Sequence, residues 1–259
     1  MEENRGIHFV LVHGACHGAW CWYKVTALLK SRGHKVTALD MAASGIHPKQ
    51  VQDIKFPEEY TQPLIDFMAS LPPEERVILV GHSMGGICIA LAMQRFPEKI
   101  SAAVFAAAIM PGPELSLSAM NGEFDRRLDS YMDTQFTSAG ESNHPATFLL
   151  FGPKFLESKL YQLSPPEDLV LALSLVRPFI MLSTPPKEVE YTKEKYGSVR
   201  RVYLVCNQDN VIKPDYQRWM IENNPPDEVK VIENSDHMVM FSRPLELCSC
   251  LQDIADKYS

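Results

Sequence analysis

The segment at residues 77–86 constrains the fold more than any other part of the chain. Four apolar residues, Val-Ile-Leu-Val, form an uninterrupted run at 77–80, the pattern of a strand buried on both faces. Gly-His-Ser-Met-Gly-Gly follows at 81–86, and a helical pattern continues to Phe96. Glycines on both sides of Ser83 allow a turn sharp enough to strain the backbone of its central residue. The segment therefore predicts a strand, a tight turn that exposes Ser83, and a helix.

Short apolar runs alternate with helical patterns over most of the chain. Besides the segment above, the predicted strands cover residues 9–12, 35–40, 102–106, 199–206 and 229–232. The predicted helices cover residues 20–30, 59–71, 215–223 and 244–258. Strands that alternate with helices at this spacing form a mostly parallel sheet with helices on both faces. The predicted fold class is therefore α/β.

The alternation stops between residues 111 and 184. This segment is rich in methionine, phenylalanine and leucine, contains helical stretches, and has no clear buried strand. We expect a helical cap that is inserted over the carboxyl edge of the sheet. The core of the fold then comprises residues 1–110 and 185–259.

Composition limits the classes of partner. A net charge of −7 and the lack of a run of lysine or arginine argue against a nucleic-acid partner. No run of 18 apolar residues occurs, and the chain starts with polar residues, so neither a membrane span nor a signal peptide is expected. The six cysteines form no Cys-x-x-Cys pair, which favours free thiols in a reducing compartment. These features predict a cytoplasmic protein.

Ser83 needs two partners before it can act as a nucleophile, because a serine hydroxyl is unreactive at neutral pH. A base must remove its proton, and a carboxylate must orient that base. His237 lies on a polar loop after the predicted strand 229–232, and Asp209 lies just beyond the predicted strand 199–206. The chain order serine, aspartate, histidine is the order found in α/β-hydrolases. We therefore predict that Ser83, Asp209 and His237 form a catalytic triad.

Other acids and histidines lie near the same predicted strand ends. Asp236 is a weaker candidate for the orienting acid because adjacent side chains point apart, and Asp40 precedes the serine in the chain. We expect His13 and His17 to have structural roles, such as hydrogen bonds to loop carbonyl groups. We expect His82 to be structural or to contact the substrate.

An ester hydrolase also needs donors for the negatively charged oxygen of its tetrahedral intermediate. The backbone N–H of Met84, at the start of the helix after Ser83, is one candidate. The loop after the first predicted strand supplies the second candidate, Ala15, and Gly14 allows that loop to approach closely.

Several segments together resemble the plant methylesterase and hydroxynitrile lyase group of α/β-hydrolases. The resemblance runs from residue 9 to residue 258 and is strongest at residues 10–20, 39–45, 80–86, 196–199 and 236–238. It implies the α/β-hydrolase fold and a serine carboxylesterase that hydrolyses small methyl esters of plant hormones or specialised metabolites. It also implies a homodimer and an enzyme that needs no metal ion or organic cofactor.

A small-ester hydrolase of this kind needs an apolar pocket for the acid part of its substrate. In the predicted cap, the candidate lining residues are Tyr131, Phe136, Phe148, Phe151, Phe155 and Met181. In the predicted core, they are Gly14, His82 and Met238.

Two other functions remain open at this point. The lyases that resemble this chain carry threonine at the position of Gly14 and lysine at the position of Met238, where the ammonium helps to hold a charged leaving group. The small Gly14 and the uncharged Met238 therefore favour ester hydrolysis over a hydroxynitrile lyase. A ligand receptor without catalytic activity is the second alternative, and retention of serine, aspartate and histidine together argues against it.

Overall fold

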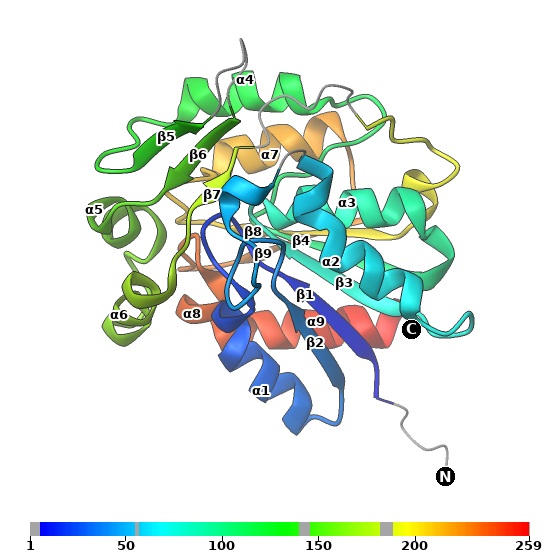
Figure 1. Cartoon of the computed structure of the whole chain (residues 1–259). Coiled ribbons are helices and arrows are strands. Elements are labelled where there is room, and N and C mark those ends of the chain that lie inside the picture. The colour runs from blue at the N-terminus through cyan, green and yellow to red at the C-terminus, as the bar shows by residue number, and fades with distance from the viewer. Residues whose placement is uncertain (1–5, 55–56, 140–145, 182–188, 259) are drawn as a thin grey trace.

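A six-stranded sheet forms the centre of the computed structural model, which describes residues 6–54, 57–139, 146–181 and 189–258 (Figure 1). All neighbouring strands of this sheet run parallel. Their order across the sheet is β2 (Lys35–Leu39), β1 (His8–Val12), β3 (Val77–His82), β4 (Ile100–Ala106), β8 (Arg201–Cys206) and β9 (Glu228–Ile232). The parallel sheet confirms the predicted fold class.

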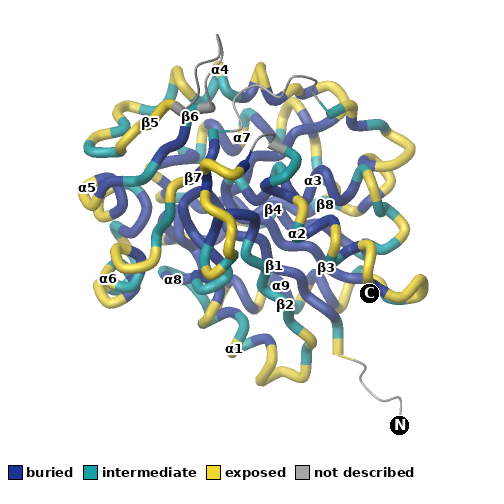
Figure 2. Tube along the Cα trace, viewed as in Figure 1, coloured by how far each residue is buried: buried dark blue, intermediate teal, exposed yellow. Residues whose placement is uncertain are grey.

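The central strands are mainly apolar because helices cover both faces of the sheet. Every residue of β1 and β3 is buried, and Figure 2 shows these strands in the dark blue of buried residues. The edge strand β9 differs, since Val229 and Val231 are exposed while Ile232 is buried. Continuous burial thus marks the inner strands β1 and β3, whereas exposed and less exposed residues alternate along the edge strand β9.

The helices divide between the two faces of the sheet. On one face, α1 (Tyr23–Ser31) packs against α9 (Pro244–Tyr258), with the short α8 (Val239–Ser242) beside them. On the other face lie α2 (Pro57–Ser70), α3 (Gly85–Arg95) and α7 (Pro214–Asn223). The predicted helix at 20–30 begins as a 3₁₀ turn, and such turns cover Ala19–Trp22, Val51–Asp53, Pro97–Lys99 and Tyr196–Ser198.

The segment between β4 and β8 contains the expected helices, but it also contains strands, which the sequence analysis did not predict. Its three strands pair into a small antiparallel sheet. The elements in chain order are α4 (Leu117–Arg127), β5 (Gln135–Ala139), β6 (Ala146–Leu150), α5 (Pro153–Phe155), a π-helical turn (Leu156–Leu160), α6 (Pro166–Leu175) and β7 (Phe179–Ile180). These strands have two to five residues, and β5 is largely exposed, so no long apolar run marks them.

Arg177 holds the cap segment against the core through several hydrogen bonds. The Arg177 guanidinium donates hydrogen bonds to the carbonyl oxygens of Gly45, His47 and Lys49 at 2.8–2.9 Å. Its backbone N–H donates to the carbonyl of Cys16 in the loop after β1. The predicted limits of the cap at residues 111 and 184 remain a prediction, and residue 184 lies outside the described residues.

Two predictions about the whole chain can be compared with the structure. In the described ranges, no helix is long and apolar enough to cross a membrane. All six cysteines are free, and five of them are buried, as predicted from their spacing.

Close packing of α3 generates a prediction about stability. A Cβ atom added to Gly86 would lie 2.1 Å from the carbonyl oxygen of Ile109, which is backbone and cannot easily move. We expect Gly86→Ala to lower the free energy of unfolding by about 1–3 kcal/mol through overpacking. Gly122→Ala on α4, where a Cβ would meet nothing within 4 Å, should raise it by about 0.5–1 kcal/mol. Urea unfolding measures both, and an unchanged Gly86→Ala midpoint would contradict the packing argument.

Candidate active site

Ser83 lies in a strained turn between β3 and α3. Its φ of 54° is in the left-handed region, which costs a residue with a side chain about 1–3 kcal/mol. A Cβ on Gly81 would lie 2.8 Å from the carbonyl oxygen of Gly85, and a Cβ on Gly85 would lie 2.6 Å from that of Val12. The predicted strand, strained turn and helix are therefore confirmed, and both flanking positions require glycine.

His237 and Asp209 meet because their strands are neighbours. Cys206 of β8 pairs with Ile232 of β9, so the loops that follow these strands lie side by side. His237 Nδ1 lies 2.7 Å from Asp209 Oδ2, and both residues are 2 % exposed. A carboxylate only accepts hydrogen bonds, so Nδ1 carries the proton and Nε2 of the neutral ring keeps its lone pair. This is the tautomer that a general base requires.

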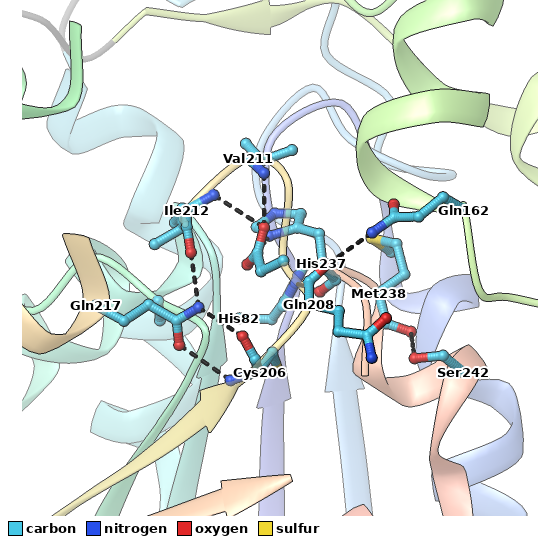
Figure 3. Close-up of polar contacts among 12 residues, drawn as sticks. His82, Gln162, Cys206, Gln208, Val211, Ile212, Gln217, His237, Met238 and Ser242 are labelled. Carbon is cyan, nitrogen blue, oxygen red and sulfur yellow. Dashed lines mark hydrogen bonds and ion pairs between the residues drawn. The ribbon is translucent and has the colours of Figure 1, made fainter. Parts of the chain in front are cut away.

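The backbone amides of Val211 and Ile212, both labelled in Figure 3, hold the Asp209 carboxylate in place. Asp209 Oδ1 accepts the N–H groups of Val211 at 2.7 Å and Ile212 at 2.9 Å. The Gln217 side chain on α7 then donates to the carbonyl oxygens of Cys206 and Ile212 and accepts the N–H of Cys206. The loop that carries Asp209 is therefore fixed at both ends.

The other two carboxylates considered above have structural partners. Asp236 Oδ2 accepts the N–H of Leu163 at 2.9 Å and the hydroxyl of Ser164 at 2.8 Å, which joins the cap segment to the loop after β9. Burial raises the pKa of Asp236. Asp40 Oδ1 accepts the N–H of Ala19 at 2.6 Å. Neither carboxylate has a described hydrogen bond to the candidate base.

The loop after β1 lies beside the turn at Ser83 because Val12 pairs with Gly81. Two buried histidines hold this loop. His13 Nδ1 donates to the carbonyl of Gly14, and His17 Nδ1 donates to the carbonyl of Ala15, both at 2.8 Å. Burial lowers the pKa of both rings, that of His17 to about 3. These contacts agree with the structural roles predicted for both histidines.

One cavity brings the candidate residues together at the carboxyl edge of the sheet. From the core it is lined by Ala15, Ser83, Met84, Ile109, Val211, Ile212 and His237. From the cap segment it is lined by Asn121, Phe124, Asp125, Tyr131, Leu149, Phe151, Phe155, Phe179 and Met181. Four of the six cap residues proposed from the sequence are in this set. Asn121, Phe124 and Asp125 have the i, i+3, i+4 spacing of one helix face, a signal that the sequence analysis missed.

Two cap residues expected at the cavity lie elsewhere. Phe148 precedes Leu149 on β6, and adjacent strand residues face opposite sides, so only Leu149 lines the cavity. Phe136 is half exposed on β5 and packs edge-on against Tyr131. Both corrections follow from strands that the sequence analysis did not predict.

Three core residues expected to contact substrate also lie outside the cavity lining. Gly14 packs directly against Ser83, since an added Cβ would be 2.8 Å from Ser83 Cβ, but it is not part of the lining. His82 is buried, and its Nε2 donates to the carbonyl oxygen of His237 at 2.7 Å, so this ring holds the loop of the candidate base. Met238 is fully buried, and its backbone N–H donates to the cap at Leu160.

The parallel sheet and the cavity at its carboxyl edge are those of an α/β-hydrolase, and comparisons with known proteins agree. The model of the alpha/beta hydrolase family matches residues 9–249, so the chain belongs to that family. Methyl jasmonate esterase 1 of Vitis vinifera is 56 % identical over 260 residues, covering 99 % of this chain and 100 % of that protein.

Two solved structures share the whole architecture. Polyneuridine aldehyde esterase, an enzyme known from Rauvolfia serpentina, superposes with a TM-score of 0.93 at 43 % identity, covering 96 % of this chain and 99 % of that chain. Tomato methylketone synthase I complexed with 2-tridecanone superposes with a TM-score of 0.92 at 49 % identity, covering 98 % and 99 %.

The hydrogen bonds of Asp209 predict the effect of replacing it with asparagine. In Asp209→Asn, the amide oxygen can keep the bonds from Val211 and Ile212, while the amide nitrogen faces His237 and favours the wrong tautomer. We expect turnover of a methyl ester to fall by on the order of 10⁴ with little change in melting temperature. A larger fall in Asp236→Asn or Asp40→Asn, at unchanged stability, would mean that the orienting acid is wrongly assigned.

Burial of His17 predicts a dependence of stability on pH. The folded ring takes up a proton only near pH 3, whereas the unfolded ring does so near pH 6.5. Between these values the unfolded state binds more protons, so the free energy of unfolding falls as the pH falls. Urea midpoints measured across this window should decrease toward acid, and His17→Gln should reduce the slope by about one proton. If the free energy of unfolding depends on pH equally steeply in His17→Gln, the conclusion that the His17 ring is buried and neutral is wrong.

Proposed function

We propose that this chain is a serine carboxylesterase that hydrolyses small methyl esters to an acid and methanol. One observation supports this most strongly: Ser83, in its strained turn, lines the same cavity as His237, whose Nδ1 is held by the buried Asp209. The names of the relatives point the same way, since they include a methyl jasmonate esterase and a polyneuridine aldehyde esterase.

The first half of the reaction forms an acyl-enzyme. His237 Nε2 takes the hydroxyl proton as Ser83 Oγ attacks the carbonyl carbon, and the electron pair of the carbonyl bond moves to its oxygen. Collapse of this tetrahedral intermediate breaks the bond to the methoxy oxygen. His237 gives its proton to that oxygen, and methanol leaves. Asp209 stabilises the imidazolium that forms between these two transfers.

Water completes the cycle. His237 takes a proton from a water molecule as the water oxygen attacks the acyl carbon of the Ser83 ester. The second tetrahedral intermediate collapses, the bond to Ser83 Oγ breaks, and His237 returns its proton to the serine. In both halves, we assign stabilisation of the oxyanion to the backbone N–H groups of Ala15 and Met84. One such donor is worth about 2.7–4 kcal/mol in the transition state.

The cavity favours an acid part that is largely apolar. Aromatic and aliphatic side chains from the core and the cap segment make up most of its lining. Esters of plant hormones or specialised metabolites have this character, and we propose them as the substrates. We further propose a cytoplasmic homodimer that works without a metal ion or organic cofactor and has no nucleic-acid or membrane partner.

The surroundings of Gly14 help to distinguish ester hydrolysis from the hydroxynitrile lyase reaction. No side chain fits there without displacing Ser83, because its Cβ would lie 2.8 Å from Ser83 Cβ and 3.3 Å from Ser83 Oγ. Met238 is buried beside the candidate base and brings no charge. The two positions that carry threonine and lysine in the resembling lyases therefore favour ester hydrolysis here.

Removing the proposed nucleophile tests this function directly. Ser83→Ala should lower kcat for methyl esters by at least about 10⁴-fold, because no acyl-enzyme can form. Substrates for this test are the methyl esters of salicylate, jasmonate and indole-acetate, scored by the acid released. Circular dichroism and the melting temperature should stay close to those of the unmodified protein. Activity within about tenfold of the unmodified protein would exclude Ser83 as the nucleophile.

Gly14 gives the test that separates the two reactions. We expect the unmodified protein to hydrolyse at least one methyl ester and to cleave cyanohydrins only weakly. Gly14→Thr together with Met238→Lys should lower ester hydrolysis by about 10²-fold, since a shift of Ser83 by a fraction of an ångström misaligns its attack. Release of cyanide measures the lyase reaction in both proteins. Cyanohydrin cleavage by the unmodified protein that exceeds hydrolysis of every ester would overturn the esterase proposal.

A further inference from the structure

Besides Ser83 and His237 from the core, the cavity has a second polar part that comes from the cap segment. Asp125 lies on α4, and Tyr131 follows this helix by a few residues. Asp125 is exposed and Tyr131 is half buried, so this polar part forms the rim where the cavity opens to solvent. Apart from Asn121, the rest of the lining is mainly aromatic and aliphatic. A ligand that reaches from Ser83 to the rim therefore meets polar groups at both of its ends.

The Tyr131 ring is held in a fixed position. Its plane is nearly perpendicular to that of Phe136 at a centroid distance of 5.1 Å and stacks on Phe155 at 6.4 Å. Burial, the charge of Asp125 and a hydrogen bond to Asp125 raise the pKa of Tyr131, so the phenol stays protonated. Because a carboxylate only accepts, Tyr131 must donate in this bond, which leaves the lone pairs of its oxygen for a ligand.

Asp125 differs from the nearby acids Glu123 and Asp129 in its ion pairs. Glu123 pairs with Arg126 and Arg127, and Asp129 pairs with two lysines. Asp125 forms no ion pair among the residues that the structure describes, although it lies between these two acids in the chain. Its carboxylate at the rim therefore has no cationic partner among the described residues.

Asp125 and Tyr131 thus present acceptor atoms and a negative charge to a ligand. On the basis of the proposed esterase function, we propose that they form a rim subsite that selects methyl esters whose acid part carries a hydrogen-bond donor at its far end. The donor is a hydroxyl or a protonated amine. An ester that ends in an acceptor alone gains no hydrogen bond from the rim carboxylate, and one that ends in an anion is repelled.

Four methyl esters of one aryl-alkanoate frame test the subsite. They differ only at the far end of the ring, which carries hydrogen, methoxy, hydroxyl or a protonated aminomethyl group. We expect kcat/KM for the hydroxyl or the aminomethyl ester to exceed that for the methoxy ester by at least about fivefold, the effect of one hydrogen bond. If only the hydroxyl ester is preferred, the subsite selects a neutral donor. If only the aminomethyl ester is preferred, the subsite selects a cation.

Variants identify the groups responsible through ratios of kcat/KM measured within each protein. Asp125→Asn should bring the ratio of donor ester to methoxy ester to within about twofold of unity, and Tyr131→Phe should lower it by a smaller factor. The matched control is Asp66→Asn on α2, which removes the same charge from an exposed residue whose side chain contacts Gln62. It should leave the ratio unchanged.

The outcomes separate this inference from the function on which it rests. If the unmodified protein hydrolyses all four esters at equal rates, the rim subsite is wrong and the esterase remains. If the preference survives in Asp125→Asn, the subsite is also wrong. If none of the four esters nor any ester of the hormone panel is hydrolysed, the proposed function itself fails.

Discussion

The left-handed backbone of Ser83 is the constraint on which the rest of the site depends. A strain of about 1–3 kcal/mol persists only where surrounding structure leaves no alternative. Here Gly81 and Gly85 pack against backbone carbonyl groups at distances that exclude any side chain, and the Ser83 carbonyl accepts the N–H groups of Gly86 and Ile109. The turn therefore points the hydroxyl into the cavity at the start of α3, where backbone N–H groups favour developing negative charge.

Hydrogen bonds to both of its oxygens hold the buried Asp209 carboxylate. Burying a carboxylate is costly unless it is hydrogen-bonded, and Asp209 receives two backbone N–H groups and the imidazole N–H of His237. Gln217 keeps the two amide donors in register with the end of β8. The acid is thereby fixed as an acceptor, and this in turn fixes the tautomer of His237.

The sequence predicted the parts of this site that rest on strong local signals. Continuous apolar runs marked β1 and β3, and glycine spacing marked the turn at Ser83, because a left-handed residue between a strand and a closely packed helix leaves few alternatives. The cap was harder, since β5 and β7 are short and β6 turns Phe148 away from the cavity but Leu149 toward it. A side chain's direction there depends on strand pairing, which a local pattern does not encode. Gln217 on α7 was missed because its role depends on how this helix packs against the end of β8, which a local pattern does not encode either.

Trapping the acyl-enzyme tests the central claim most directly. The protein is mixed with a methyl ester that it hydrolyses, quenched in acid within the first turnovers, digested and analysed by mass spectrometry. The account predicts that the peptide containing Ser83 gains the mass of the acyl group, and that Ser83→Ala shows no such adduct. Acylation of a different residue, or turnover of the ester with no adduct under conditions where deacylation limits the rate, would contradict it.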